Sequence, residues 1–195
     1  MSGVGVASES IRSPRLDLVL LSLPIMDAIV AGDRRGAQAL AGFAVADELF
    51  SGEPEDAAYF SMRRNQVLRD ASWAPWSQRA IVSREDNAMI GTVTFHGPPG
   101  VNDTSTLDAV EIGYEIFPAH RGRGFATEAG RAMIDWAHRE HGVDLFVSGV
   151  APENLPSLRV NEKLGFVPTG QIVDDELIFA LHVASSCGRR VRAET

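Results

Sequence analysis

The chain has 195 residues, of which 45% are hydrophobic and 23% charged, and this balance is that of one ordinary globular domain. It has no run of about 18 or more apolar residues and no basic start followed by an apolar stretch, so we expect a soluble, cytoplasmic protein without a membrane span or signal peptide. The formal net charge of −8 disfavours nucleic acid as a partner and favours cationic small molecules or basic peptides.

The first part of the chain predicts one strand and three helices. Residues 1–14 are rich in Ser and Gly and lack periodicity, so we expect a flexible N-terminal segment there. Alternating apolar residues predict a strand over 15–21, and helical spacing of apolar residues predicts the helices that follow. The predicted helices span residues 24–31, 35–41 and 56–69.

The middle of the chain predicts three strands. Residues 78–83 and 89–96 form two of them, joined by a polar cluster suited to a hairpin turn, and a loop over 97–106 follows. The third strand covers 110–116, where alternation places Glu111, Gly113 and Glu115 on one face and the apolar side chains on the other.

The last part alternates helices and strands. Apolar residues on one stripe predict a helix over 124–140, and Gly165 in the capping position ends a second helix over 155–164. The remaining predicted strands span 143–150, 166–173 and 176–183. The pattern indicates a single domain over 15–183 with a mixed α/β fold and a flexible tail over 184–195.

One loop has the pattern of a phosphate-binding site. The chain leaves a strand, passes two glycines and enters a helix within the sequence Arg121-Gly122-Arg123-Gly124-Phe125-Ala126. The first turn of a helix leaves backbone N–H groups unpaired, and the glycines and arginines favour the close approach of an anion such as a pyrophosphate. The alternative to a phosphate site is that the two glycines only allow the chain to turn between the strand and the helix. NAD and ATP are disfavoured, because Thr127 stands where a dinucleotide motif needs Gly or Ala and no Gly-Lys-Ser/Thr occurs.

Three segments together resemble the GNAT acetyltransferase superfamily. They are the strand Glu111–Ile116, the loop and helix start Arg121–Ala129, and the stretch from Asn154 to Phe166. They are most similar to the branch that includes the ribosomal-protein N-terminal acetyltransferases, and residues 110–166 are the diagnostic part. The resemblance implies a mixed, mostly antiparallel sheet of about six or seven strands, flanked by helices and splayed in the middle to admit coenzyme A.

The resemblance implies acetyl-CoA as co-substrate and no metal. Arg121, Gly124 and Ala126 match the family's pyrophosphate-binding signature, and backbone groups over 114–116 would pair with the pantetheine arm. The cofactor-binding residues implied in this way are Tyr114, Glu115, Ile116, Arg121, Gly122, Arg123, Gly124, Phe125, Ala126, Thr127, Asn154 and Ser157.

Acyl transfer to an amine needs a base, a polarised carbonyl and a proton for the leaving thiolate. Glu111 is the preferred base, with Glu115 or a water chain as alternatives, and an ordinary solvated glutamate is the competing interpretation. A backbone N–H near Ile116 would polarise the thioester. Ser157 is the candidate general acid, and Asn154 belongs to the catalytic set, although capping a helix would also explain it. Asn161 stands where many family members carry a proton-donating tyrosine.

We therefore expect an acetyl-CoA-dependent N-acetyltransferase that transfers the acetyl group directly to a primary amine. The acceptor is either a protein N-terminus or a small cationic amine, since no motif identifies it. The alternative is a catalytically silent CoA-binding regulatory module. The chain leaves the oligomeric state open, with a homodimer as one option.

Overall fold

The computed structural model describes residues 10–183, which form one eight-stranded sheet with the strand order β1-β2-β3-β4-β5-β6-β8-β7. The strands are β1 (Ile11–Arg12), β2 (Leu16–Leu20), β3 (Arg79–Ser83), β4 (Ala88–Phe95), β5 (Ala109–Ile116), β6 (Leu145–Val150), β7 (Val167–Val173) and β8 (Glu176–His182). Neighbouring strands are antiparallel except β5 and β6, which are parallel. The expected mixed, mostly antiparallel sheet is confirmed, and short β1 brings the number of strands to eight.

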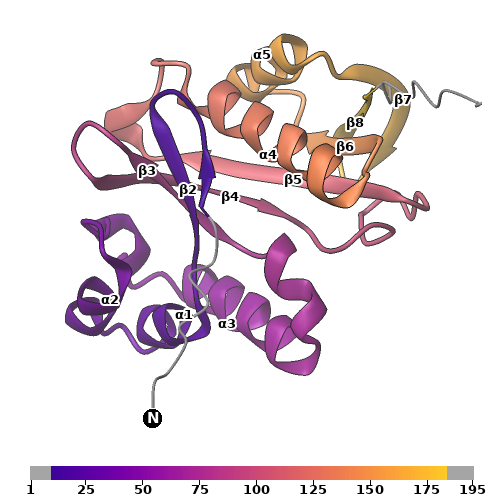
Figure 1. The fold of residues 1–195 in the computed structure, drawn as a ribbon. Helices are drawn as coiled ribbons and strands as arrows, with labels where there is room; N and C mark the ends of the chain where they lie inside the picture. Colours follow the sequence, from indigo (N-terminus) through magenta and orange to yellow (C-terminus); the bar gives the residue numbers. More distant parts are fainter. Residues whose placement is uncertain (1–9, 184–195) are drawn as a thin grey trace, which may run out of the picture.

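Helices cover both faces of this sheet (Figure 1). One face carries α1 (Leu23–Val30), α2 (Arg34–Ala41) and α3 (Pro54–Arg69), and the other carries α4 (Phe125–His141) and α5 (Leu155–Leu164). Three short 3-10 helices, Asp47–Phe50, Ala71–Trp76 and Pro118–His120, connect the larger elements. In this three-layer arrangement, successive side chains of one strand point to opposite faces of the sheet and so contact different helix layers.

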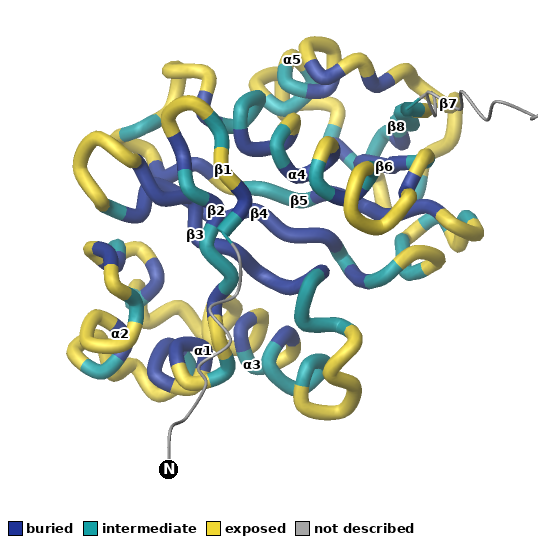
Figure 2. Tube along the Cα trace, viewed as in Figure 1, coloured by how far each residue is buried: buried dark blue, intermediate teal, exposed yellow. Residues whose placement is uncertain are grey.

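Two hydrophobic clusters hold the layers together, and Figure 2 shows the buried residues concentrated along the central strands. In the first, Met133 of α4 and Val110 of β5 are fully buried. In the second, Met26 of α1 and Val82 of β3 are almost completely buried. Burying each such side chain stabilises the fold by about 1.5–3 kcal/mol, so both faces of the sheet are firmly covered.

The sheet opens at its centre, between β5 and β6. These strands pair only over Ala109–Glu111 and Leu145–Val147, and the pairing ends there although β5 continues to Ile116. Glu111 and Phe117 direct their backbone hydrogen bonds towards β4, through His96 N–H and Ile90 C=O. Because backbone groups alternate along a strand, the N–H and C=O groups of Tyr114 and Ile116 point away from β4 into the opening.

The N-terminal strand lies inside the segment that the sequence predicted to be flexible. Ile11 and Arg12 pair with β2 as β1, and Ile11 is buried. The Ser13 hydroxyl and the Arg15 backbone and guanidinium all donate to the Glu128 carboxylate on α4. The rest of the predicted N-terminal segment, residues 1–9, and the predicted tail over 184–195 lie outside the described residues. Within residues 10–183, no helix is long and apolar enough to cross a bilayer.

Candidate active site

Two glycines shape the corner at which the chain enters α4. Gly122 and Gly124 have φ angles of 75° and 79°, in the left-handed region that glycine adopts without steric cost. Gly124 is the N-cap of α4 and offers no side chain to its first turn. Across residues 10–183, no hydrogen bond occupies the N–H groups of Gly122, Arg123 or Gly124. The corner therefore presents several free N–H donors at the positive end of a helix dipole.

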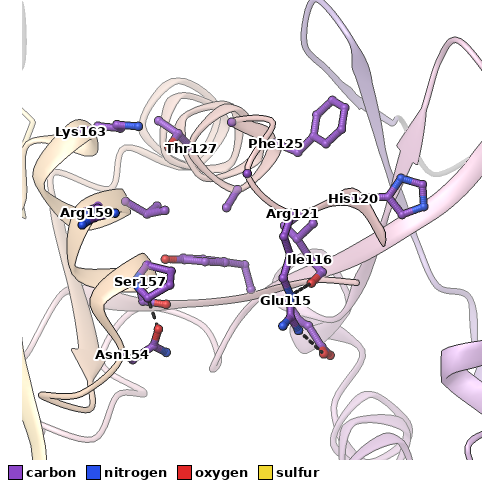
Figure 3. Close-up of a pocket in the computed structure, with 16 residues that line it drawn as sticks. Glu115, Ile116, His120, Arg121, Phe125, Thr127, Asn154, Ser157, Arg159 and Lys163 are labelled. Atoms are coloured by element: carbon purple, nitrogen blue, oxygen red, sulfur yellow. Dashed lines mark hydrogen bonds and ion pairs between the residues drawn. The ribbon is translucent and has the colours of Figure 1, made fainter. Parts of the chain in front are cut away.

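A cavity of about 630 Å³ extends from this corner to the opening between β5 and β6 (Figure 3). All the expected cofactor-binding residues except Arg123 line it. These are Tyr114, Glu115, Ile116, Arg121, Gly122, Gly124, Phe125, Ala126, Thr127, Asn154 and Ser157. The Arg123 guanidinium instead stacks over the Phe125 ring, 4.9 Å from its centroid. Arg123 therefore contributes its backbone N–H to the corner, and its side chain does not line the cavity.

The cationic side chains of this cavity come from two elements. Arg121 turns towards β5, where its Nε donates to the Ile116 carbonyl at 2.7 Å and Nη2 lies 3.9 Å from Glu115 Oε1. Arg159 and Lys163, one turn apart on α5, line the same cavity (Figure 3). The sequence interpretation missed both, although their i, i+4 spacing on a helix next to the Asn154 segment was a usable signal.

At the α5 end of the cavity, Asn154 and Ser157 lie together (Figure 3). The Asn154 side chain caps α5 by accepting the Ser157 backbone N–H at 3.2 Å. The Tyr114 hydroxyl is buried beside the Ser157 hydroxyl and has no well-formed hydrogen bond within the described chain. Burial raises the pKa of Tyr114, and the Ser157 hydroxyl opposes part of that rise. Two hydroxyl groups thus meet where the cavity reaches β5.

Asn161 does not line this cavity. It is 1% exposed, and its Nδ2 donates to the Ser148 hydroxyl at 3.3 Å between α5 and β6. The amide therefore serves the packing of α5 against the sheet. Tyr114 and Ser157 do line the cavity, and their hydroxyl groups lie next to each other.

Glu111 lies on the opposite face of β5 from this cavity and is only 2% exposed. Its Oε2 accepts the Asp103 backbone N–H at 2.8 Å and lies 3.4 Å from His96 Nδ1. The interpretation of Glu111 as an ordinary solvated glutamate is therefore wrong, because the side chain is enclosed. Glu115 follows on the same face of the strand, but it is exposed and also borders the cavity at the end of β5.

The groups around Glu111 form one titrating cluster. Burial alone would raise the pKa of Glu111, but hydrogen bonds from His96 and from the backbone of Asp103 and Gly149 hold it below its ordinary value. Burial alone would lower the pKa of His96, but the Glu111 and Asp103 carboxylates outweigh burial and raise it. Burial and the same two carboxylates raise the pKa of Glu176 on β8. His96 and Glu176 were not among the predicted site residues.

A splayed sheet with a helix N-terminus at the mouth of the opening is an arrangement suited to an anionic ligand. The model of the acetyltransferase (GNAT) domain family matches residues 38–167. The chain therefore belongs to the GNAT acetyltransferase family.

The similar proteins agree with this assignment. The chain is 40% identical over 91 residues to the probable N-acetyltransferase YjcK of Bacillus subtilis, a match that covers 46% of this chain and spans about half (48%) of that relative. It is 26% identical over 158 residues to the uncharacterized N-acetyltransferase YjdG of the same organism, covering 80% of this chain and 89% of that one. The fold is similar to that of RimL, a ribosomal L7/L12 α-N-protein acetyltransferase solved with coenzyme A, at a TM-score of 0.60 and 17% identity over 90% of this chain and 98% of that one.

Proposed function

We propose that this protein is an acetyl-CoA-dependent N-acetyltransferase that transfers the acetyl group directly to a primary amine, either a protein N-terminus or a small amine. The observation that carries the proposal is the continuous cavity from the α4 corner to the split between β5 and β6. A ligand that fills it needs an anionic group at one end and an extended arm at the other. Acetyl-CoA has both.

Each part of the cofactor has a counterpart in the cavity. The free N–H groups of the corner would hold the pyrophosphate, with Arg159 and Lys163 supplying full positive charges. Tyr114 would pair with the pantetheine amides through its N–H and C=O, and Ile116 through its N–H, since Arg121 already donates to the Ile116 carbonyl. One of their N–H groups would polarise the thioester carbonyl as charge develops on its oxygen.

The leaving sulfur would lie beside Ser157. Its hydroxyl would donate a hydrogen bond to the thiolate as the carbon–sulfur bond breaks, and Asn154 would fix the start of α5 that carries it. On the other face of β5, the cluster around Glu111 would take the proton of the incoming ammonium. Its negative charge, like the net charge of the chain, favours a cationic acceptor.

A panel screen tests this proposal. Acetyl-CoA is incubated with the protein and with polyamines, aminoglycosides, amino acids or N-terminal peptides, and free thiol is measured. We expect thiol release and an acetylated product with at least one amine. Tight binding of coenzyme A by calorimetry without thiol release for any amine would instead identify a silent CoA-binding module.

A further inference from the structure

Glu111 is too enclosed to meet an acceptor amine directly. Its side chain is 3% exposed, and one oxygen already accepts the Asp103 N–H at 2.8 Å. The Gly149 backbone N–H faces the same carboxylate, and a Cβ added at Gly149 would lie 3.5 Å from its Oε1. A proton that reaches this carboxylate must come through a neighbour with access to the acceptor.

His96 is that neighbour. Its side chain is 39% exposed, and its Nδ1 lies 3.4 Å from Glu111 Oε2 and 3.9 Å from Asp103 Oδ1. Two carboxylates on one ring nitrogen favour the tautomer that carries hydrogen on Nδ1. Nε2 then has a free lone pair, and no hydrogen bond within residues 10–183 occupies it. The carboxylates of Glu111 and Asp103 thus hold the ring at Nδ1, and Nε2 on the other side is free to act as a base.

The free nitrogen lies at the position where the two strands separate. Nε2 is 3.4 Å from the point where a Cβ on Gly113 would stand, so the imidazole covers this glycine. Gly113 lies two residues beyond Glu111, the last residue of β5 that pairs with β6. In the proposed binding mode, a cofactor arm that runs from the α4 corner past Tyr114 would bring its thioester to the split, near Gly113.

We propose that His96 Nε2 accepts the proton of the acceptor ammonium and that Glu111 is the positioning residue that holds the imidazole. This inference rests on the proposed acetyl transfer. Proton transfer from R–NH3⁺ to Nε2 leaves a neutral amine and an imidazolium. The amine nitrogen then bonds to the thioester carbon, the carbon–sulfur bond breaks, and the second nitrogen proton passes to the thiolate. The products are the acetamide, the free thiol and protonated His96, which releases its proton to solvent.

A histidine suits this step better than a buried carboxylate, because its pKa lies closer to the pH at which an amine must lose its proton. The charged groups that face His96 are Glu111, Asp103 and Glu176, which stabilise the imidazolium, and Arg63 of α3, which opposes it. The active form of His96 is the neutral one. The rate should therefore rise with pH through the raised pKa of His96 and level off above it.

The test measures kcat/KM against pH for the best amine of the panel, in the wild type and in His96→Gln, Glu111→Gln and His182→Gln. His182 is an exposed histidine at the other end of β8, roughly 20 Å from Glu176, and is the matched control. We expect His96→Gln to lower the plateau about a hundredfold or more and to abolish the ionisation. The kcat/KM profile of Glu111→Gln should still show an ionisation, but at a lower pH than that of the wild type. His182→Gln should match the wild type, and calorimetry should find coenzyme A affinity unchanged in all variants.

The outcomes separate the two proposals. A His96→Gln enzyme with the wild-type rate and pH profile would overturn the role of His96 and leave the acetyltransferase standing. Ligand atoms of His96, Asp103 and Glu111 lie within 4.8 Å of one another, close enough to hold a metal ion, so loss of wild-type activity on adding EDTA would likewise overturn the role of His96 as a base. A wild type that releases no thiol with any amine would overturn the proposed function, and the inference with it. An NMR titration of the His96 ring supplies a readout without turnover, because a pKa that does not fall in Glu111→Gln would rule out the pair.

Discussion

At the scale of single residues, the proposed mechanism separates cofactor binding from proton transfer. Ser157 and Tyr114 bring two hydroxyl groups to the cavity on one side of β5, while Glu111 and His96 form an acid–imidazole pair on the other. Successive side chains of a strand point to opposite faces, so neighbouring positions on β5 would serve the leaving sulfur and the attacking amine separately. In the proposed mechanism, alternation along one strand would thus supply both halves of an acyl transfer.

The role of Ser157 can be tested by removing its hydroxyl. Ser157→Ala should lower kcat about tenfold or more, because the thiolate loses a hydrogen bond that forms only as the carbon–sulfur bond breaks. The affinity for coenzyme A should change much less, as measured by calorimetry. Ser51→Ala, at the end of a distant 3-10 helix, is the control. Equal turnover in Ser157→Ala and the wild type would remove Ser157 from the mechanism.

Glu128 ties the N-terminal strands to α4 in a pH-dependent way. Burial opposes its charged form, but hydrogen bonds from Ser13 and Arg15 outweigh burial and hold the pKa below the ordinary 4.5. The folded state therefore binds this proton less readily than the unfolded state. The stabilisation is present above pH 4.5 and is lost as the pH falls through the folded-state pKa.

We therefore expect Glu128→Gln to lower the free energy of unfolding at neutral pH, measured by urea denaturation. Between about pH 5 and about pH 3 the stability of the wild type should fall more steeply than that of the variant. Glu85→Gln, an exposed glutamate in the β3–β4 turn, should follow the wild type at every pH. Parallel curves for Glu128→Gln and the wild type would contradict this account.

At the scale of elements, the start of α4 and the separation of β5 from β6 together create the proposed cofactor cavity. The left-handed glycines orient free N–H groups towards the same space into which β5 directs its unpaired backbone. The second helix, α5, completes the wall with Arg159 and Lys163. β5 and α5 hold the strand donors and the two cations, so this part of the site would need little rearrangement to bind an extended, charged cofactor.

Gly124→Glu should abolish coenzyme A binding while leaving the fold intact. The new carboxylate would meet the pyrophosphate, and such a like-charge contact costs several kcal/mol, about a hundredfold or more in affinity. Gly142→Glu is the matched control, because Gly142 caps the other end of α4 with a similar φ angle of 67° and has open space around it. Both variants carry the same backbone strain. Calorimetry should find lost affinity only in Gly124→Glu, and equal affinities would count against the cofactor site.

At the scale of the whole molecule, net charge favours one class of acceptor. The chain carries 26 acidic and 18 basic side chains, and the proposed acceptor face gathers Glu111, Asp103 and Glu176 around His96. The proposed cofactor face instead gathers Arg121, Arg159 and Lys163. A cationic amine and an anionic cofactor would thus be attracted to different faces of the same strand.

Salt should therefore weaken the acceptor step for cationic amines. Raising ionic strength from about 0.05 M to about 0.5 M shortens the screening length severalfold, so KM for a polyamine or basic peptide should rise. KM for an amine without a second positive charge should change less. Steady-state kinetics at saturating acetyl-CoA measures both. The same salt dependence for the two acceptors would show that the acidic face does not select the substrate.

Much of the fold and part of the site could be predicted from the sequence. The helix over 155–164 was placed at its observed bounds, and the other predicted helices and strands differ from the observed ones by at most two residues at either end. The cofactor cavity contains the predicted residues apart from Arg123. The two-residue strand β1 was missed, because so short a segment shows no alternation and depends on its pairing with β2.

The amino-acid sequence alone determined the glycine corner, the alternation of β5 and the caps of α4 and α5. Each of these is a backbone conformation that depends mainly on the residue and its immediate neighbours. Only the tertiary structure decided that Glu111 is enclosed, that His96 lies against it, and that Arg159 and Lys163 face the corner. Burial, contact and pKa depend on groups far apart in the chain, which the fold alone brings together.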